Sequence, residues 1–268
     1  MRNYRAILLA AGFGKRLKPL TEIWPKCLMP IQGKPLLDLW ISNLQTAGIR
    51  DILVNTHYMA NTVKEFLNRE KFKDLVTLSY EEQILGTAGA IKANRKFFKN
   101  SPVLVAHADN FCSCDFAGFI SHHELNRPEG CPISMMSFQC NNPSSCGIIE
   151  VDELGIVQRM HEKVANPPGK LANGAVYIFE PEIIEWISQS DNVSDISTEV
   201  LPEFLGRILN WENNQIHIDI GRLEDLKAAQ KFEMYDRKMP RQTPDAWEIN
   251  FAKHEIHHLI EKNNGTVS

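Results

Sequence analysis

An apolar run that ends at a pair of glycines is the feature that most constrains the fold of this chain. Residues 5–10 are compact and mostly apolar, and Gly12 and Gly14 follow almost at once. A run of this length that stops at glycines predicts a buried strand feeding a loop. Glycines let backbone N–H groups approach a phosphate closely, and Lys15 and Arg16 add positive charge. The sequence therefore predicts an anion-binding loop directly after its first strand.

Two common phosphate loops do not fit this segment. The dinucleotide-binding pattern needs a third glycine where this chain has Leu17, and the P-loop needs serine or threonine where it has Arg16. An NAD enzyme and a P-loop ATPase are therefore disfavoured.

Helical and strand patterns alternate along the first half of the chain. Apolar spacing predicts helices over 35–47, 59–68 and 88–98, and strands over 51–55, 76–80 and 103–106. Such alternation predicts a mostly parallel sheet covered by helices on both faces. The expected fold class is therefore α/β, with a Rossmann-like sheet.

The pattern loosens after residue 126. Turn-forming segments separate four expected strands, over 133–139, 147–151, 157–161 and 175–179. We expect these strands to complete a mixed sheet and to add a substrate-facing lobe. A helix is predicted over 223–235, and a polar segment then leads to a terminal helix over 247–262.

Composition limits the kind of partner. The chain has 268 residues, a net charge of −4 and a pI of about 6.2, which argues against broad nucleic-acid binding. The apolar run at 6–11 is too short for a signal peptide or a membrane span, and the six cysteines are scattered. We therefore expect a cytoplasmic protein with free thiols. Seven basic residues and one acid among the first 34 residues indicate a local anion site.

The residues around the glycines form a longer and more specific motif. Residues 9–21 read LAAGFGKRLKPLT, and Pro25-Lys26 and Pro30-Ile31 follow. This pattern resembles the signature of the sugar-1-phosphate nucleotidyltransferase family, and the resemblance extends from residue 6 to about residue 230. It implies a glycosyltransferase-A-like nucleotidyltransferase fold in one domain, with a nucleotide-binding part over 1–126, a sugar-binding part over 127–235 and a tail over 236–268.

The resemblance also implies a reaction. Members of the family join a nucleoside triphosphate to a sugar 1-phosphate and release pyrophosphate, with Mg²⁺ as cofactor. Arg16 and Lys26 match the catalytic cations that balance charge on the leaving group. No nucleic acid or membrane is implied as a partner, and a homodimer is compatible. The implied nucleotide-binding residues are Leu9, Ala10, Ala11, Gly12, Gly14, Lys15, Arg16, Gln83, Gly86, Thr87 and Ala88.

Within this set, Gln83 and Gly86 match the positions that read the base. An ordinary helix start, with Thr87 as its cap, is the alternative interpretation of the same segment. Both interpretations can hold together, because a helix N-terminus is a favourable place for a phosphate group.

Two aspartates match the metal ligands of the family. Asp109 follows a predicted strand at the edge where parallel sheets bind ligands, and Asp219 lies in an Asp-Ile-Gly motif before a predicted helix. Carboxylates are hard ligands that suit Mg²⁺, although a turn and a helix cap are their alternative roles. The sugar-phosphate-binding residues that the resemblance implies are Asp109, Asn110, Glu162, Lys163, Asn173 and Gly174.

Substrate identity depends on finer similarities. Segments 85–90 and 141–149 are most similar to guanylyltransferases for mannose 1-phosphate or manno-heptose 1-phosphate, which implies GTP as the nucleotide. Three alternatives stay open: a thymidylyl- or uridylyltransferase for glucose 1-phosphate, a phosphocholine-type cytidylyltransferase, and a non-catalytic regulatory homologue. Ala108 and Arg222 depart from the family pattern near the expected metal and sugar sites. The motifs therefore constrain the identity of the sugar less than they constrain the reaction.

Overall fold

The structure is a computed structural model that describes residues 2–232 and 243–262. The strands of this part are β1 (Arg5–Leu9), β2 (Pro30–Ile31), β3 (Lys34–Pro35), β4 (Asp51–Thr56), β5 (Val76–Tyr80), β6 (Val103–His107), β7 (Asn110–Cys112), β8 (Ile133–Gln139), β9 (Gly147–Val151), β10 (Val157–Glu162), β11 (Leu171–Phe179), β12 (Ile208–Glu212) and β13 (His217–Asp219). The helices are α1 (Leu20–Ile23), α2 (Leu36–Thr46), α3 (Ala60–Leu67), α4 (Thr87–Ala93), α5 (Arg95–Phe98), α6 (Phe116–Asn126), α7 (Pro181–Gln189), α8 (Leu223–Ala229), α9 (Ala246–Ala252) and α10 (Ile256–Lys262).

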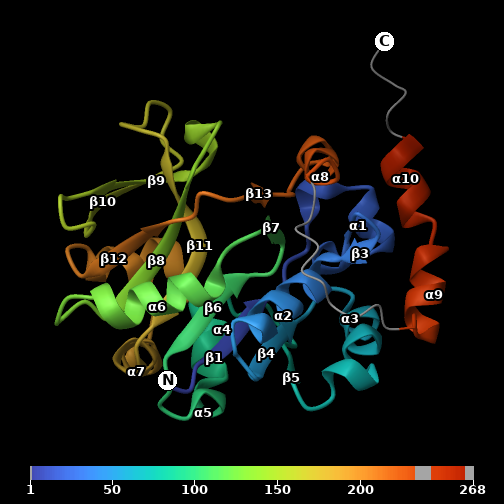
Figure 1. The fold of residues 1–268 in the computed structure, drawn as a ribbon, viewed down its shortest axis with the longest axis horizontal. Helices are drawn as coiled ribbons and strands as arrows, with labels where there is room; N and C mark the ends of the chain where they lie inside the picture. Colours follow the sequence, from blue (N-terminus) through green and yellow to red (C-terminus); the bar gives the residue numbers. More distant parts are fainter. Residues whose placement is uncertain (1, 233–242, 263–268) are drawn as a thin grey trace.

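A nine-stranded mixed sheet forms the centre of the molecule (Figure 1). Its main path runs β10-β9-β11-β6-β1-β4-β5, and β8 and β12 attach to it through β11. The strands β6, β1, β4 and β5 are parallel to one another. The expected α/β class and its mixed sheet are confirmed.

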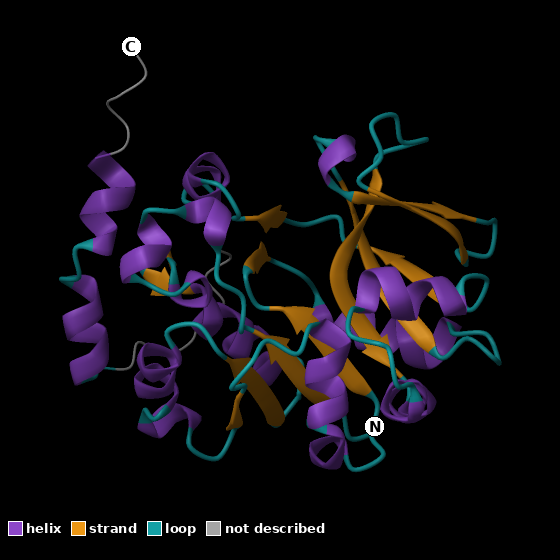
Figure 2. Cartoon of the chain, turned by 180° about the vertical axis from the view of Figure 1, so that it is seen from behind, coloured by secondary structure: helices purple, strands orange, loops and turns teal. Residues whose placement is uncertain are grey.

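Side chains of the parallel strands alternate between the two faces of the sheet, because successive residues of a strand point in opposite directions. In β1, Ala6 and Leu8 join the core with residues of α2, α3 and α6. Ile7 and Leu9 join the opposite core with residues of α4 and α7. Helices therefore cover both faces, as Figure 1 and Figure 2 show from opposite sides. None of the helices in the described ranges is long and apolar enough to cross a membrane.

The sheet changes from parallel to antiparallel at β11. This strand runs against β6, with Val176 opposite Ala106, and also against β8 and β9. Its register with β8 shifts between Asn173 and Tyr177, which is the signature of a bulge. The strand expected over 175–179 therefore begins earlier, at Leu171.

Two predicted helices are shorter than expected. The helix expected over 88–98 breaks at Asn94, whose side chain donates to the Ala90 carbonyl oxygen at 2.8 Å and separates α4 from α5. The helix expected over 223–235 ends at Ala229, where i→i+3 hydrogen bonds tighten the chain. Residues 233–235 lie outside the described part.

The terminal helix expected over 247–262 is two helices, α9 and α10. The helix α9 packs on Trp24, whose ring lies 5.6 Å from the Phe251 ring, and His254, between the two helices, lies 4.2 Å from the same ring, centroid to centroid. Arg69 fastens α9 through Asp245 at 2.7 Å. The helix α9 and His254 therefore cover Trp24, two residues before Lys26.

A short ladder joins the middle of the chain to its later part. The strands β7 and β13 pair antiparallel, so that Asp219 lies opposite Asn110. Because Asp109 directly precedes Asn110, this ladder brings the two predicted metal ligands to one place.

Candidate active site

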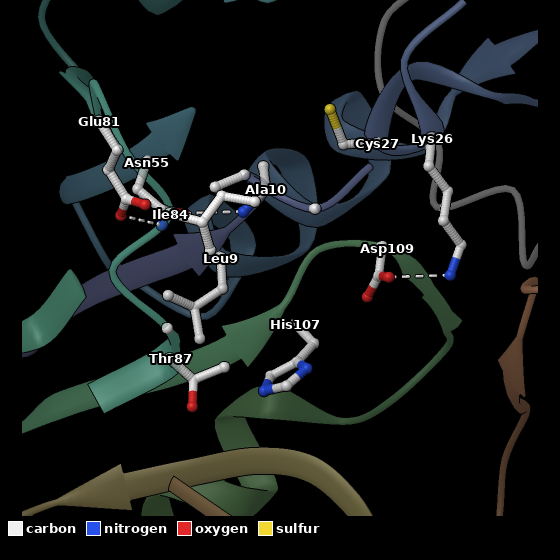
Figure 3. A pocket seen from close by; sticks show the side chains of 13 residues that line it. Leu9, Ala10, Lys26, Cys27, Asn55, Glu81, Ile84, Thr87, His107 and Asp109 are labelled. Atoms are coloured by element: carbon white, nitrogen blue, oxygen red, sulfur yellow. Dashed lines mark hydrogen bonds and ion pairs between the residues drawn. The ribbon is translucent and has the colours of Figure 1, made fainter. Parts of the chain in front are cut away.

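Four neighbouring parallel strands deliver their carboxyl ends to one edge of the sheet. The strand β1 ends at Leu9, β4 carries Asn55, β5 is followed by Glu81, and β6 ends at His107. Such an edge is where ligands bind in open α/β sheets. A pocket of about 160 Å³ lies there (Figure 3). Of the residues predicted to bind ligand, it is lined by Leu9, Ala10, Ala11, Gly12, Lys26, Gly86, Thr87 and Asp109.

A second pocket of about 190 Å³ shares Lys26 and Asp109 with the first. The predicted phosphate-binding residues Gly14, Lys15 and Arg16 complete its wall with Gly221. The two pockets therefore adjoin each other at Lys26 and Asp109, and together they form the candidate site.

Lys26 lies between the two predicted metal ligands. Its Nζ is 2.8 Å from Oδ2 of Asp109 and 3.1 Å from Oδ1 of Asp219. The other oxygen of Asp219 accepts from Arg16 at 2.8 Å. The Lys26 side chain is 5% exposed, whereas those of Asp109 and Asp219 are 36% and 47% exposed. The carboxylates therefore balance a buried ammonium and still present oxygen to the pockets.

The contacts in this cluster shift the pKa values of its residues. Burial by itself raises the pKa of Asp219, but Lys26 and Arg16 outweigh burial and hold that pKa below its ordinary value. The hydrogen bond to Asp219 in turn raises the pKa of Arg16. Burial lowers the pKa of the neighbouring His107, which leaves its imidazole neutral at neutral pH.

A glycine allows the contact between Arg16 and Asp219. A Cβ atom at Gly221 would lie 2.7 Å from Nη2 of Arg16, which is too close for any real side chain. The Asp-Ile-Gly motif therefore supplies both a carboxylate and the space that the guanidinium needs to reach it.

The glycine loop is held by hydrogen bonds on both sides. The Ala10 N–H donates to Oδ1 of Asn55 at 2.8 Å, and the Thr21 hydroxyl donates to the Gly14 carbonyl oxygen at 3.1 Å. Gly14 adopts the left-handed conformation, with φ at 62°. Gly12 lies between these anchors with open space beside it. The loop is therefore fixed at its ends and open at its centre.

The wall at the β5 end of the pocket is formed by Glu81 and not by the predicted Gln83. Gln83 is exposed and is not among the lining residues. Glu81 is 4% exposed and lines the pocket. Its Oε1 accepts from Nδ2 of Asn55 at 2.7 Å, and its Oε2 accepts from the Leu85 N–H at 3.2 Å.

Only some of the predicted residues at the start of α4 line the pocket. Gly86, with φ at 79°, and Thr87 line the pocket. Ala88 is fully buried, and its N–H donates to the Ser194 carbonyl oxygen at 2.9 Å. The Thr87 hydroxyl donates to Asp195 at 3.2 Å. The first polar groups of α4 are therefore used inside the fold, and Ala88 has no face on the pocket.

Three of the predicted sugar-phosphate-binding residues form a separate group. Glu162 lies in register with Gly147, and a Cβ atom at Gly147 would meet the Glu162 carboxylate at 2.6 Å and Cβ of Asn173 at 3.9 Å. Lys163 contacts Oε1 of Glu162 at 3.1 Å and is 66% exposed. The structure therefore brings Glu162, Lys163 and Asn173 together, but outside the two pockets described above.

The bulge in β11 orients Asn173. Its Nδ2 donates to the Tyr177 hydroxyl at 2.8 Å, and its Oδ1 accepts from the Ala175 N–H at 2.9 Å. Gly174 is buried, and a Cβ atom there would collide with Met136. Because Val176 pairs with Ala106, the residues before it lie at the edge where β6 ends. Asn110 is half-buried at that edge, opposite Asp219.

Besides Cys27 and Ile84, three lining residues of the first pocket were not predicted from the sequence: Asn55, Glu81 and His107. Each is a polar residue at or just after the carboxyl end of a parallel strand. Their position at the carboxyl ends of predicted strands was the signal that could have identified them.

Comparison with known proteins gives a family and several relatives. A family described as "Nucleotidyl transferase" matches residues 5–235. A protein of Sulfolobus acidocaldarius named as a mannose-1-phosphate guanyltransferase is 31% identical over 201 residues, which are 75% of this chain and 54% of that protein. Mannose-1-phosphate guanyltransferase 2 of Candida glabrata is 28% identical over 252 residues, which are 90% of this chain and 67% of that protein. The chain therefore spans between 54% and 67% of the length of these relatives.

Two solved structures share the fold. HddC from Yersinia pseudotuberculosis, complexed with GMP-PN, is 26% identical with a TM-score of 0.71, over 85% of this chain and 98% of that one. A structure from Bacillus anthracis, named as a glucose-1-phosphate thymidylyltransferase and holding a sucrose, has a TM-score of 0.76 over 92% of this chain and 99% of that one. Its identity of 21% shows likeness of fold only.

Proposed function

Because the chain belongs to the nucleotidyl transferase family, we propose that it joins a nucleoside triphosphate to a sugar 1-phosphate and releases pyrophosphate. The observation that carries this proposal is the convergence of Arg16, Lys26, Asp109 and Asp219 beside the glycine loop. Two cations and two carboxylates next to open backbone N–H groups suit a triphosphate bound with a divalent cation.

The proposed reaction needs no nucleophile from the protein. An ionised oxygen of the sugar 1-phosphate attacks the α-phosphorus and forms a new P–O bond. The bond from the α-phosphorus to the bridging oxygen breaks, and pyrophosphate leaves with the electron pair. Arg16 and Lys26 stabilise the charge that develops on this leaving group, and the glycine loop holds the triphosphate in position.

Asp109 and Asp219 are the proposed Mg²⁺ ligands. The two carboxylates already share one cation, the Lys26 ammonium, so their arrangement fits a positive ion. In the described ranges no group of three or more His, Cys, Asp or Glu side chains could hold a metal. Two carboxylates would leave positions for phosphate and water oxygens, the ligands that usually complete a Mg²⁺ site. When bound, Mg²⁺ would neutralise part of the triphosphate charge.

Glu81 supports guanine as the base. An ionised carboxylate only accepts hydrogen bonds, and guanine offers two neighbouring donors, N1–H and the N2 amino group. Uracil and thymine offer a single ring N–H on the matching edge. We therefore propose that Glu81, and not Gln83, reads the base, and that GTP is the nucleotide. The names of the relatives and the GMP-PN in HddC agree with this choice.

The group at Glu162, Lys163 and Asn173 is the proposed sugar-phosphate site. Lys163 supplies an exposed cation for the phosphate, and Glu162 and Asn173 supply acceptors and donors for hydroxyl groups. We propose mannose 1-phosphate or a manno-heptose 1-phosphate as the substrate. Residues 1–126 would then form the nucleotide-binding part of the domain, and residues 127–235 the sugar-binding part.

The proposal is tested by a matrix of substrates. The purified chain is assayed for pyrophosphate release with GTP, ATP, CTP, UTP and dTTP, each against mannose 1-phosphate, manno-heptose 1-phosphate and glucose 1-phosphate. We expect the highest kcat/KM with GTP and a manno-configured sugar, and loss of turnover in excess EDTA. Preference for dTTP or UTP with glucose 1-phosphate would instead identify the thymidylyl- or uridylyltransferase. A folded chain that releases no pyrophosphate with any pair would be a regulatory homologue.

A further inference from the structure

His107 differs from the other polar side chains of the first pocket. Its Nε2 is enclosed by protein and has no hydrogen-bond partner within the described residues. The remaining charged, amide and hydroxyl side chains of the wall are paired: Lys26 with Asp109, Asn55 with Glu81, and Thr87 with Asp195. Buried polar atoms are nearly always paired in folded proteins, so an unpaired one beside a pocket points to a ligand.

The place of His107 in the pocket limits which part of a nucleotide it can meet. It ends β6, opposite Leu9 at the end of β1. Its ring lies between Thr87 and Asp109 in Figure 3. The proposed base reader, Glu81, stands at the β5 end of the same wall. The phosphates belong at the opposite end, with Lys26. In a nucleotide the ribose joins these two parts.

We propose that Nε2 of His107 forms a hydrogen bond with a ribose hydroxyl of the bound nucleotide and thereby selects ribonucleotides over deoxyribonucleotides. This proposal rests on the proposed function, because it takes a nucleoside triphosphate as the occupant of the pocket. Of the predicted sugar-phosphate residues, Asp109 lines this pocket, but Glu162, Lys163 and Asn173 lie outside it, which favours the ribose over the acceptor sugar as the source of the hydroxyl.

Selectivity follows from the cost of leaving a buried polar atom unpaired. A nucleotide with the hydroxyl completes the hydrogen bonding of His107, whereas one without it leaves Nε2 buried and unsatisfied. A site built in this way rejects an analogue that lacks the group. The net free energy of one neutral hydrogen bond corresponds to a roughly tenfold preference in kcat/KM.

The test compares GTP with 2′-deoxy-GTP and 3′-deoxy-GTP in the wild type and three variants. His107→Ala removes the hydrogen-bonding group, and His107→Gln retains an amide that can replace it. His122→Ala is the matched control, because Nε2 of His122 is also buried and unpaired but lies on α6, outside the pocket. The measured quantity is the ratio of kcat/KM for GTP to kcat/KM for each deoxy analogue.

We expect the wild type and His122→Ala to prefer GTP over one of the two analogues by roughly tenfold. The ratio should fall to about one in His107→Ala and be partly restored in His107→Gln. A wild type that uses both analogues as well as GTP would overturn the proposal without any variant. So would an unchanged ratio in His107→Ala. If the wild type turns over no nucleotide, the proposed function fails instead. If His107→Ala leaves the nucleotide ratio unchanged but loses the preference for the sugar 1-phosphate over its deoxy analogues, His107 would instead bind the acceptor sugar.

Discussion

Two clusters of charged residues lie at opposite edges of the sheet, and they differ in how completely they are closed. The first, here called the pocket cluster, consists of Arg16, Lys26, Asp109 and Asp219 and lies where β6 ends. The second, here called the Glu180 cluster, lies where β11 ends and therefore at the other edge, because β11 runs against β6. The second cluster consists of Arg2, His123, Arg127 and Glu180.

The two clusters differ in the solvent exposure of their carboxylate side chains. In the Glu180 cluster, the carboxylate is 10% exposed and contacts Arg2 at 2.6 Å, His123 at 2.8 Å and Arg127 at 3.1 Å. In the pocket cluster, the side chains of Asp109 and Asp219 are 36% and 47% exposed. A closed network stabilises the fold, whereas carboxylates that retain open oxygen can exchange their partners for a ligand. We therefore expect the Glu180 cluster to stabilise the fold and the pocket cluster to bind substrate.

The largest effect is expected from Asp109→Asn. This change removes the charge of a proposed metal ligand without changing its size. We expect kcat to fall about 10²–10³-fold, the scale for losing one essential electrostatic partner, while the urea midpoint stays near that of the wild type. Asp191→Asn, at an exposed aspartate after α7, is the matched control and should leave kcat unchanged. Near-normal turnover at an unchanged Mg²⁺ optimum would show that Asp109 is only a turn residue.

The opposite pattern is expected from Glu180→Gln. The change breaks a nearly buried ionic network, so the free energy of unfolding should fall by about 2 kcal/mol. The kcat/KM should remain within about twofold of the wild type, because the cluster lies at the edge away from the pockets. Urea unfolding and steady-state kinetics on one preparation measure both quantities. Loss of turnover without loss of stability would break the comparison.

Glu180 and His123 also predict how stability depends on pH. Burial by itself raises the pKa of Glu180, but His123, Arg2 and Arg127 outweigh burial and hold it at about 2. Burial lowers the pKa of His123 below 6.5. Both groups therefore bind protons more readily in the unfolded chain, and stability is lost as the pH falls. The loss should begin near pH 6.5 and grow between about pH 4.5 and pH 2, and Glu180→Gln should remove the second part.

A smaller effect on activity, larger for GTP than for UTP, is expected from Glu81→Gln. Replacing one oxygen acceptor by a donor mismatches guanine, so kcat/KM for GTP should fall about 10- to 100-fold, and kcat/KM for UTP should fall less. The matched control is Gln83→Ala, at the exposed position two residues later, which should remain within about twofold of the wild type. The reverse pattern, with Gln83 sensitive and Glu81 not, would return base reading to Gln83.

The smallest effect is expected from Lys163→Ala. Its side chain is 66% exposed, so stability should change by less than about 0.5 kcal/mol. We expect KM for the sugar 1-phosphate to rise roughly tenfold and KM for the nucleotide to stay unchanged, because one charge-assisted contact is lost. Lys170→Ala, at another exposed lysine of the same loop, provides the control. Equal effects of the two changes would remove Lys163 from the sugar-phosphate site.

Local patterns in the sequence predicted the parallel half of the sheet well. The strands β1, β4 and β6 contain short apolar runs followed by polar or small residues, and this length and these flanking residues favour a strand over a helix. The helix α7 was missed although Pro181 opens it and Ile183, Ile184 and Ile187 lie on one face. The strand β12 was missed as well, because its pairing partner β8 lies far away in the sequence.

The charged site could be predicted only through the family motif. Lys26 lies 83 residues from Asp109 and 193 from Asp219, and no local pattern can place such residues together. What joins the two aspartates is the ladder between β7 and β13, in which each strand has three residues and gives little periodic signal. The proposed base site shows the same limit, because proposing Glu81 in place of Gln83 needed the exposure of each side chain in the fold.

The most direct test of the account follows two radioactive labels through the reaction. The chain is incubated with mannose 1-phosphate, Mg²⁺ and GTP labelled in either the α- or the γ-phosphate, and the products are separated. We predict that the α-label enters the nucleotide sugar and the γ-label enters pyrophosphate, and that Asp109→Asn slows both transfers equally. Entry of the γ-label into the sugar product would contradict the account, because the pocket cluster would then transfer a phosphoryl group and not a nucleotidyl group.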